Sequence, residues 1–182
     1  LPFLIGWSVA FMVFTSVQII SAFFIQDQLG ISDPDQVIKF TSIALLSMAL
    51  TSTFMQAVVL QVINISTQTL LRICFLIFGM VLISISVVDS LTEFFLAYAG
   101  MGIAFSMITP SLNAAATLSV EPSEQGEVAG FLAGAPVVGM IFGPTIGTLL
   151  YNIDPTFPFY YGGLGAIILG VYFQFVRVSE NN

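Results

Sequence analysis

The feature that most constrains this chain is the distance between its charged residues. Six long stretches carry no Asp, Glu, Lys or Arg, and they cover residues 1–26, 40–71, 73–88, 94–120, 128–153 and 155–176. The hydrocarbon core of a bilayer is about 30 Å thick and takes about 20 helical residues to cross. Each stretch is long enough for one crossing, except that the third needs Leu70 and Leu71 and leaves Arg72 at the interface. The spacing therefore predicts six membrane-spanning segments.

These segments are predicted to be α-helices rather than strands of a barrel. Helices and closed barrels are the two ways to satisfy the backbone in lipid, and barrel strands alternate apolar and polar residues. Runs such as Val81-Leu82-Ile83 do not alternate. We expect an all-α, polytopic membrane protein with a single six-helix domain over residues 1–182. The expected helices span residues 3–25, 36–63, 70–88, 92–118, 124–151 and 157–176.

Two connectors carry recognisable helix start signals. Asp33 and Pro34 combine an Asx N-cap with a proline in the first turn. Ser90 and Glu93 form the pattern of a capping box, in which each side chain accepts a hydrogen bond from an otherwise unpaired N–H. Both signals support the expected starts of the second and fourth helices.

Composition argues against several classes of function. The chain is 57% hydrophobic and 7% charged, whereas soluble domains carry about a quarter charged residues. The net charge of −7 argues against a nucleic-acid partner. The sequence contains no histidine, which removes His-dependent catalysis and His-based metal sites. We expect no metal, no cofactor and no enzymatic activity, with the lipid bilayer as a principal partner.

The acidic residues fall in expected connectors, at helix ends or in the C-terminal tail. They are Asp27, Asp33, Asp35, Asp89, Glu93, Glu121, Glu124, Glu127, Asp154 and Glu180. A proton relay inside a membrane normally requires an intramembrane carboxylate or histidine. If protons drive this protein, we expect the coupling residue in a part of the protein outside this sequence.

The three cations predict the orientation. Six crossings place both ends on one side, together with Arg72 and Arg177, whereas only Lys39 lies on the other. The positive-inside rule then places both termini of the segment in the cytoplasm. The chain begins at Leu1 in apolar sequence, without the pattern of a signal peptide. We interpret it as a piece of a longer protein.

The fifth expected helix carries glycines in two triplets. Their steps are four residues inside each triplet and five between them, at Gly126, Gly130, Gly134, Gly139, Gly143 and Gly147. A spacing of four places small residues on one face, where another backbone can approach closely. Pro136 and Pro144 each remove a helical hydrogen bond. The candidates for helix packing or conformational change are Gly130, Gly134, Pro136, Gly139, Gly143, Pro144 and Gly147. Simple close packing and a moving interface both explain this pattern.

Polar residues recur on one face of several expected helices. Gln18 lies near the middle of the first, and Asn113 belongs to a polar face of the fourth. An amide in lipid is costly unless it finds a partner or a wet cavity. Aromatic and Met side chains with a few polar groups suit an apolar organic ligand. The candidate substrate-binding residues are Phe14, Thr15, Gln18, Thr51, Met55, Thr109 and Asn113. Hydrogen bonding that only holds the helices together is the alternative for each of them.

Several segments of the sequence resemble a known family. The segments EPSEQGEVAG (121–130), GMIFGPTIGTLLY (139–151) and FPFY (157–160) are similar to the tenth-to-eleventh helix region of the major facilitator superfamily. They look most like its drug:proton antiporter branch, which includes tetracycline-efflux proteins. The resemblance covers nearly the whole chain and implies helices seven to twelve, the C-terminal half of a transporter with twelve helices. By that resemblance Gln18 and Asn113 would face a central cavity between the two halves.

The resemblance also implies partners, a location and a function. The partners would be an N-terminal six-helix half, a small-molecule substrate and protons, in a bacterial inner membrane. The implied function is proton-coupled efflux of apolar or amphipathic compounds by alternating access. An uptake transporter for sugars or organic acids, or a structural or signalling membrane subunit without a substrate, are the alternatives. One departure is the connector 64–71, which lacks the arginines and the glycine common in the family.

Overall fold

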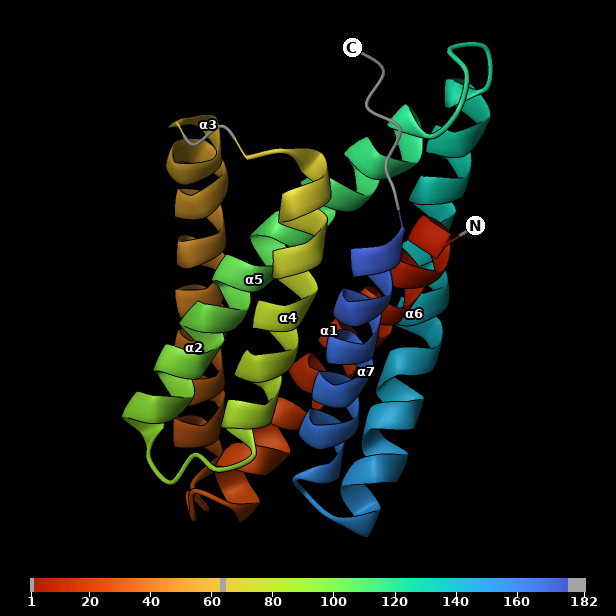
Figure 1. Cartoon of the computed structure of the whole chain (residues 1–182). Helices are drawn as coiled ribbons and strands as arrows, with labels where there is room; N and C mark the ends of the chain where they lie inside the picture. The colour runs from red at the N-terminus through yellow and green to blue at the C-terminus, as the bar shows by residue number, and fades with distance from the viewer. Residues whose placement is uncertain (1, 63–64, 177–182) are drawn as a thin grey trace.

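The computed structural model describes residues 2–62 and 65–176. In chain order its helices are α1 (Pro2–Asp27), α2 (Pro34–Phe54), the π-helical turn η1 (Met55–Val59), α3 (Leu60–Val62), α4 (Thr67–Ile85), α5 (Leu91–Leu118), α6 (Gln125–Ile153) and α7 (Phe157–Phe175). None of the described residues forms a β-strand. The all-α fold class expected from the sequence is confirmed (Figure 1).

The second rod of the bundle, formed by α2, η1 and α3, contains a turn that the sequence does not predict. α2, η1 and α3 follow one another without a break over Pro34–Val62. In η1 the N–H of Leu60 donates to the carbonyl of Met55, five residues earlier. This arrangement defines a π-helical turn, a feature that often occurs at functional sites. The last residue of the expected helix over residues 36–63 lies outside the described residues.

Capping residues explain where α2 and α5 begin. Asp33 accepts a hydrogen bond from the N–H of Asp35 at 3.1 Å. Ser90 accepts from the N–H of Glu93 at 3.3 Å, as in the expected capping box. The Glu93 carboxylate accepts from the N–H of Asp89 at 3.0 Å, one residue before the partner that this motif normally uses. The box therefore also orders the residue that precedes the cap.

α4 begins earlier than expected because of a cap that was not recognised. Ser66 accepts a hydrogen bond from the N–H of Thr69 at 3.2 Å and serves as the N-cap. The helix therefore starts at Thr67 rather than at residue 70, and it ends at Ile85 rather than at residue 88. The shift moves Arg72 from the helix end into its second turn.

The long helices pack side by side in pairs. α1 packs along α6, α2 along α5 and α4 along α7, while α4 also packs against α5 (Figure 1). A Cβ added to Gly79 would lie 2.6 Å from the carbonyl oxygen of Gly163, so the backbones of α4 and α7 touch. Phe24 joins three helices near one end, because its ring lies 5.7 Å from that of Phe94 and 5.1 Å from that of Phe159. Glycine contacts and aromatic rings thus join the helices within a core that also contains many aliphatic side chains.

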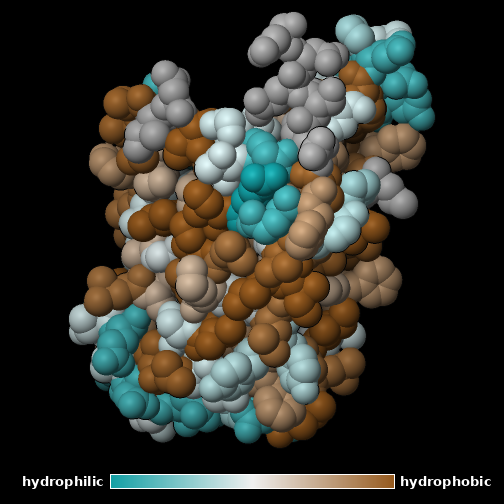
Figure 2. Space-filling model, viewed as in Figure 1, coloured by the Kyte–Doolittle hydropathy of each residue, from teal (hydrophilic) through white to brown (hydrophobic). Residues whose placement is uncertain are grey.

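The outer surface is apolar where a soluble protein would be polar. Large hydrophobic side chains such as Leu50, Ile141 and Ile168 are more than half exposed. Figure 2 shows hydrophobic residues across the middle of the bundle and hydrophilic residues mostly toward its two ends. In a bilayer, such an apolar surface is in contact with lipid instead of water. The arrangement matches an integral membrane bundle.

Five of the described rods are long and apolar enough to cross a membrane by themselves: α1, the continuous α2–α3 rod, α4, α5 and α6. The remaining rod, α7, has 19 residues, which corresponds to about 28 Å of helix. It runs antiparallel to α4, because Gly163 lies beside Ile83 and Gly170 lies beside Leu76. It therefore covers the same depth of the bundle as its neighbour.

Candidate functional site

The C-terminal glycine triplet of α6 is buried against α1. A Cβ on Gly139 would lie 2.5 Å from both the N of Met12 and the carbonyl oxygen of Ser8. A Cβ on Gly143 would collide with the hydroxyl oxygen of Thr15 and lie 2.5 Å from the carbonyl oxygen of Met12. One on Gly147 would lie 2.7 Å from Cβ of Ser16. Only glycine leaves room for this approach of the two backbones.

Hydroxyl groups of α1 bond the backbone of α6 along the same contact. Ser8 donates to the carbonyl of Ala135 at 2.9 Å, and Thr15 donates to the carbonyl of Gly139 at 3.2 Å. Ser16 donates to the carbonyl of Gly143 at 2.5 Å. These acceptors belong to the helical backbone, so the bonds are additional to the helical ladder. The contact is both close and polar.

A tryptophan of α1 satisfies a carbonyl that a proline leaves unpaired. Pro136 has no N–H, so the carbonyl of Leu132, four residues earlier, loses its helical donor. The indole N–H of Trp7 donates to this carbonyl at 3.0 Å in a buried position. Pro144 leaves the carbonyl of Met140 without its helical N–H in the same way. The Trp7 bond therefore fixes α1 against the bend in α6.

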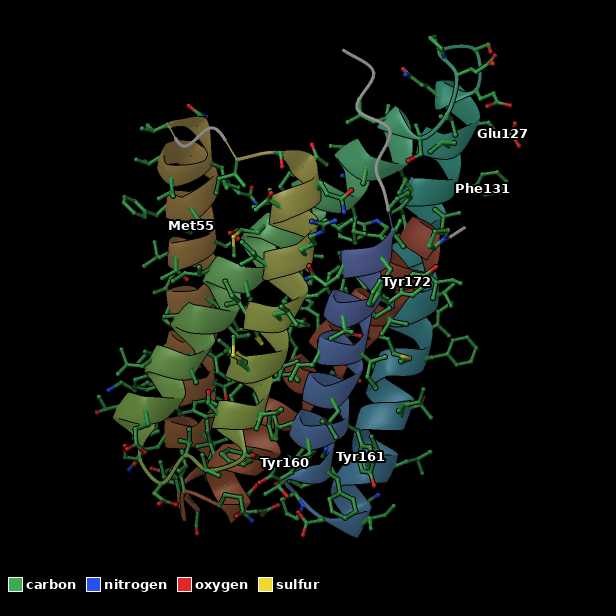
Figure 3. All side chains as sticks on the ribbon, in the orientation of Figure 1. Met55, Glu127, Phe131, Tyr160, Tyr161 and Tyr172 are labelled. Atoms are coloured by element: carbon green, nitrogen blue, oxygen red, sulfur yellow. The ribbon has the colours of Figure 1, made fainter. Side chains whose placement is uncertain are left out.

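The N-terminal triplet of α6 has different surroundings. Cβ atoms added to Gly126, Gly130 and Gly134 would meet no heavy atom of the described residues within 4 Å. Glu127 and Phe131 lie on this part of α6 and point away from the other helices (Figure 3). The triplet is therefore an open face of the bundle.

The contact between α2 and α5 resembles the one between α1 and α6. Thr51 donates to the carbonyl of Ala99 at 2.9 Å, and Ser47 donates to the carbonyl of Phe95 at 3.2 Å. A Cβ on Gly102 would collide with the carbonyl oxygen of Met48. Two pairs of helices therefore join through a glycine on one helix and hydroxyl groups on the other.

Aromatic rings form a connected row between α1 and α5. The ring of Trp7 lies 4.9 Å from that of Phe11 in an edge-on arrangement. Phe11 lies 5.3 Å from Phe105, and Phe14 stacks on Phe105 at 4.2 Å. Phe11, Phe14 and Phe105 are partly exposed. The row presents π-faces at the surface where these helices meet.

Two hollows lie at the ends of this aromatic row. One, of about 270 Å³, is lined by Phe14, Met48, Ala49, Ser52, Thr53, Gly102 and Phe105 from α1, α2 and α5. The other, of about 460 Å³, is lined by Trp7, Asn113, Thr117, Ala129, Leu132, Ala133 and Pro136 from α1, α5 and α6. Both combine an aromatic side chain with hydroxyl groups or an amide, the lining typical of sites for small organic ligands.

Three of the polar candidates have no hydrogen-bond partner for their side chains among the described residues. Gln18, Thr109 and Asn113 form no side-chain hydrogen bond within the part of the chain that the structure describes. Gln18 lies nine residues before the end of α1, about 13 Å along the axis, and is half-buried. Asn113 is exposed and lines the larger hollow. An unpaired amide at this depth requires water or a ligand.

The charged groups lie toward the ends of the bundle. Asp27, the last residue of α1, accepts a hydrogen bond from the hydroxyl of Tyr151 at 2.9 Å. In the turn between α6 and α7, the hydroxyl and the N–H of Thr156 both donate to the Asp154 carboxylate, which lowers the pKa of that carboxyl. No three metal-ligating side chains gather within residues 2–62 and 65–176. Asp27 therefore joins the ends of α1 and α6, and Asp154 orders the turn between α6 and α7.

A comparison with protein families identifies the fold. The model of the Major Facilitator Superfamily matches residues 3–181. The chain belongs to this superfamily. The six-helix bundle is a half of the facilitator type, and no curated relative matches the sequence.

A solved structure agrees with this assignment. A bacterial homologue of the human lysosomal transporter Spinster, in an inward-facing and unoccupied conformation, has a TM-score of 0.76 with this chain at 14% sequence identity. The match covers 97% of this chain and 42% of that one. The likeness shows the fold, and the facilitator chain described here spans less than half the length of that transporter.

The facilitator half brings only some of the sequence candidates to the hollows. Phe14 lines the smaller hollow, and Asn113 and Pro136 line the larger one. Gln18, Thr109 and Met55 line neither hollow, although Met55 opens the π-helical turn and is labelled on the second rod in Figure 3.

Thr15 and Thr51 lie at contacts between helices. Each donates to a carbonyl of its own helix and to one of the neighbouring helix. Each also lies against a glycine, Gly143 for Thr15 and Gly102 for Thr51. In this structure their hydroxyl groups hold pairs of helices together.

Two residues of the site were not recognised in the sequence. Trp7 pairs with the carbonyl that Pro136 leaves free, and Phe105 joins the aromatic row. The position four residues before a helical proline always has a free carbonyl, which is a signal that a donor is needed there. The sequence carries no signal for the identity of that donor, because it comes from a helix 125 positions away.

Proposed function

We propose that this chain is one half of a transporter that moves a small organic solute across the membrane by alternating access. The substrate would lie between the α1–α2–α5–α6 face and a second six-helix half. The single observation that carries this proposal is the aromatic row with its two hollows, beside which the side chains of Gln18 and Asn113 have no protein partner in the described residues. Superfamily membership supports the reaction class.

The lining favours an apolar or amphipathic solute. Phe11, Phe14 and Phe105 offer partly exposed rings, which bind flat or aliphatic groups through area and π-contacts. The free amides supply a small number of hydrogen bonds without charge. A solute with a formal charge would find no counter-ion on this face, since the described carboxylates and cations lie toward the bundle ends. This chemistry agrees with the resemblance to drug efflux proteins.

The proposed energy source is a proton gradient coupled through the other half. The acidic residues of this chain lie in connectors, at helix ends or in the tail, and none falls in the middle of a helix. An intramembrane carboxylate that binds and releases a proton would therefore belong to the second half. We further propose that both ends of this chain face the cytoplasm of a bacterial cell, on the basis of the cation distribution.

Transport by the full-length protein in proteoliposomes tests the proposal. A panel of apolar, amphipathic and sugar-like compounds would be assayed with and without a proton gradient. Gln18→Ala and Asn113→Ala are expected to reduce transport of an amphipathic substrate about tenfold, the effect of losing roughly one hydrogen bond of 1.4 kcal/mol. Matched controls are Gln26→Ala and Asn152→Ala, which remove the same groups at exposed helix ends.

The outcomes separate the competing functions. Reduced transport in the first pair only, with normal membrane insertion, supports the binding face. Normal transport in all four variants would reject it. Gradient-driven uptake of sugars or organic acids would support a nutrient transporter of the same superfamily, and a protein that moves no compound would support a structural subunit.

A further inference from the structure

Arg72 is a cation on the outer surface of the bundle at a level where lipid begins. It lies five residues after the start of α4, about 7.5 Å along the helix axis. Helical side chains lean toward the N-terminus of their helix, so the guanidinium leans toward the near end of the bundle. Figure 2 shows a hydrophilic patch over α4 and α7 with hydrophobic residues below it. On these two helices Arg72 and Gln68 both donate to carbonyls at the end of α7, Arg72 to that of Gln174.

The apolar neighbours of Arg72 identify what covers this surface. On the same two helices Ile73 is 42% exposed, Tyr172 48% and Phe175 81%. Side chains of this kind are stable at such exposure in contact with acyl chains and the interfacial region. The patch is therefore at the lipid boundary, beside the ends of α4 and α7.

Part of the patch is explained by helix capping. The Nη2 of Arg72 donates to the carbonyl of Gln174 at 3.1 Å. The Nε2 of Gln68 donates to the carbonyls of Phe173 at 3.3 Å and Val176 at 2.7 Å. These carbonyls at the end of α7 lack helical donors. The polar start of α4 thus caps the end of its antiparallel neighbour.

Capping leaves the charge of Arg72 without a counter-ion among the residues that the structure describes. Within residues 2–62 and 65–176 it forms no ion pair with a carboxylate, and its Nε is shielded without a hydrogen-bond partner. A guanidinium has five N–H donors, of which one is used here. Shielded charge without a partner is unfavourable, and more so beside hydrocarbon. The unused donors of the guanidinium suit an anion with several acceptor oxygens.

We infer that Arg72 binds the phosphate of an anionic phospholipid. The planar guanidinium matches a phosphate through two parallel hydrogen bonds, and a phospholipid presents its phosphate at the depth that Arg72 reaches. In the orientation proposed above, the site lies in the cytoplasmic leaflet, where anionic lipids attract basic residues. The carbonyl of Gln174 keeps the cation at the end of α7, and the exposed apolar residues around it contact the acyl chains.

The test uses the purified full-length protein in detergent. Native mass spectrometry counts bound lipid, and thermal unfolding is followed with added phosphatidylglycerol or zwitterionic phosphatidylcholine. The variant Arg72→Gln removes the charge but keeps an amide that can donate to the carbonyl of Gln174. Lys39→Gln is the matched control, because it removes the same charge from an exposed position at the other end of the bundle. Arg72→Lys keeps the charge without the planar fork.

Phosphatidylglycerol is expected to bind the wild type and Lys39→Gln equally and to raise the Tm of both. Arg72→Gln should bind it about fivefold more weakly, the effect of losing one juxtamembrane cation, and Arg72→Lys should lie between them. The readout for each variant is the difference in Tm between added phosphatidylglycerol and added phosphatidylcholine. A lower Tm of Arg72→Gln in the absence of lipid therefore does not affect the test. Undiminished binding by Arg72→Gln, equal stabilisation by phosphatidylcholine, or full stabilisation by inorganic phosphate alone would overturn the inference.

Discussion

The two glycine triplets of α6 have the same spacing in the sequence and opposite surroundings in the structure. The triplet from Gly139 is buried against α1, whereas Cβ atoms added to the triplet from Gly126 would have no neighbouring heavy atom of the described residues within 4 Å. Each helical residue turns the chain by about 100°, so the one step of five residues rotates the second triplet by about 100° relative to a continued stripe. The two triplets therefore cannot both face α1. The comparison teaches that glycine spacing predicts a helix face on which another helix can pack closely. It does not predict which helix, if any, packs there.

The largest expected effect distinguishes the buried triplet from the open one. Gly143→Leu would force a side chain into Thr15 and the backbone of Met12, which cannot yield. We expect a loss of about 3 kcal/mol or more in stability, measured as a lower Tm and a smaller monodisperse fraction of the full-length protein. Gly130→Leu is the control, with stability near that of the wild type. Equal damage from both variants would show that another part of the full-length protein covers the open triplet.

The next effect concerns the bond that fixes α1 at the boundary between the two triplets. Trp7→Phe removes the donor to the carbonyl of Leu132 and should lower the stability by about 1–2 kcal/mol. Pro136→Ala restores a helical N–H to the same carbonyl. In that background the Trp7→Phe substitution should be less damaging, as thermal unfolding of the four proteins would reveal. Strictly additive losses would contradict the pairing of Trp7 with the proline position.

Two glycine-to-alanine substitutions should have smaller effects on stability, and these effects should be opposite in sign. Gly130→Ala adds a methyl group to open space and improves helix propensity, so it should raise stability by up to about 1 kcal/mol. Gly139→Ala adds the same group 2.5 Å from the backbone of α1 and should lower stability. Unfolding by denaturant measures both. If Gly130→Ala also lowers stability, the open triplet has a partner in the complete protein.

The smallest effect tests the far end of the contact between α1 and α6. Tyr151→Phe removes the exposed hydrogen bond to Asp27 and should cost about 0.5 kcal/mol, at the low end for such bonds. Tyr161→Phe removes an exposed hydroxyl that makes no hydrogen bond in the described chain and serves as the control. Identical Tm values for the two variants would remove Tyr151 from the contact.

The sequence predicted the fold class because charge spacing and bilayer thickness leave few alternatives. It predicted the cap at Ser90 but missed the cap at Ser66, where no acidic residue follows at the third position to complete a box. The π-helical turn at Met55 was also missed, since an apolar run of Met, Ala and Val carries no local signal for an extra residue in a turn.

Site residues were harder to predict than helices because their roles depend on neighbours far along the chain. Thr15 and Gln18 lie on the same helix, yet only Thr15 meets a glycine of α6 and uses its hydroxyl there. Thr51 likewise meets Gly102, whereas the side chain of Asn113 has no partner in the described residues. Residue type alone could not separate the groups that join helices from those left available to a ligand.

The hydroxyl-to-carbonyl bonds between α1 and α6 have a mechanical consequence. The acceptors at Ala135, Gly139 and Gly143 recur at every turn, and the glycine face continues to Gly147 without a side chain in the way. A displacement of α1 by one turn, about 5.4 Å, would offer its hydroxyl groups an equivalent row of acceptors. The same step would break the buried bond from Trp7 to the carbonyl of Leu132. The α1–α6 contact is therefore repetitive along its hydroxyl groups and is held in one register by Trp7.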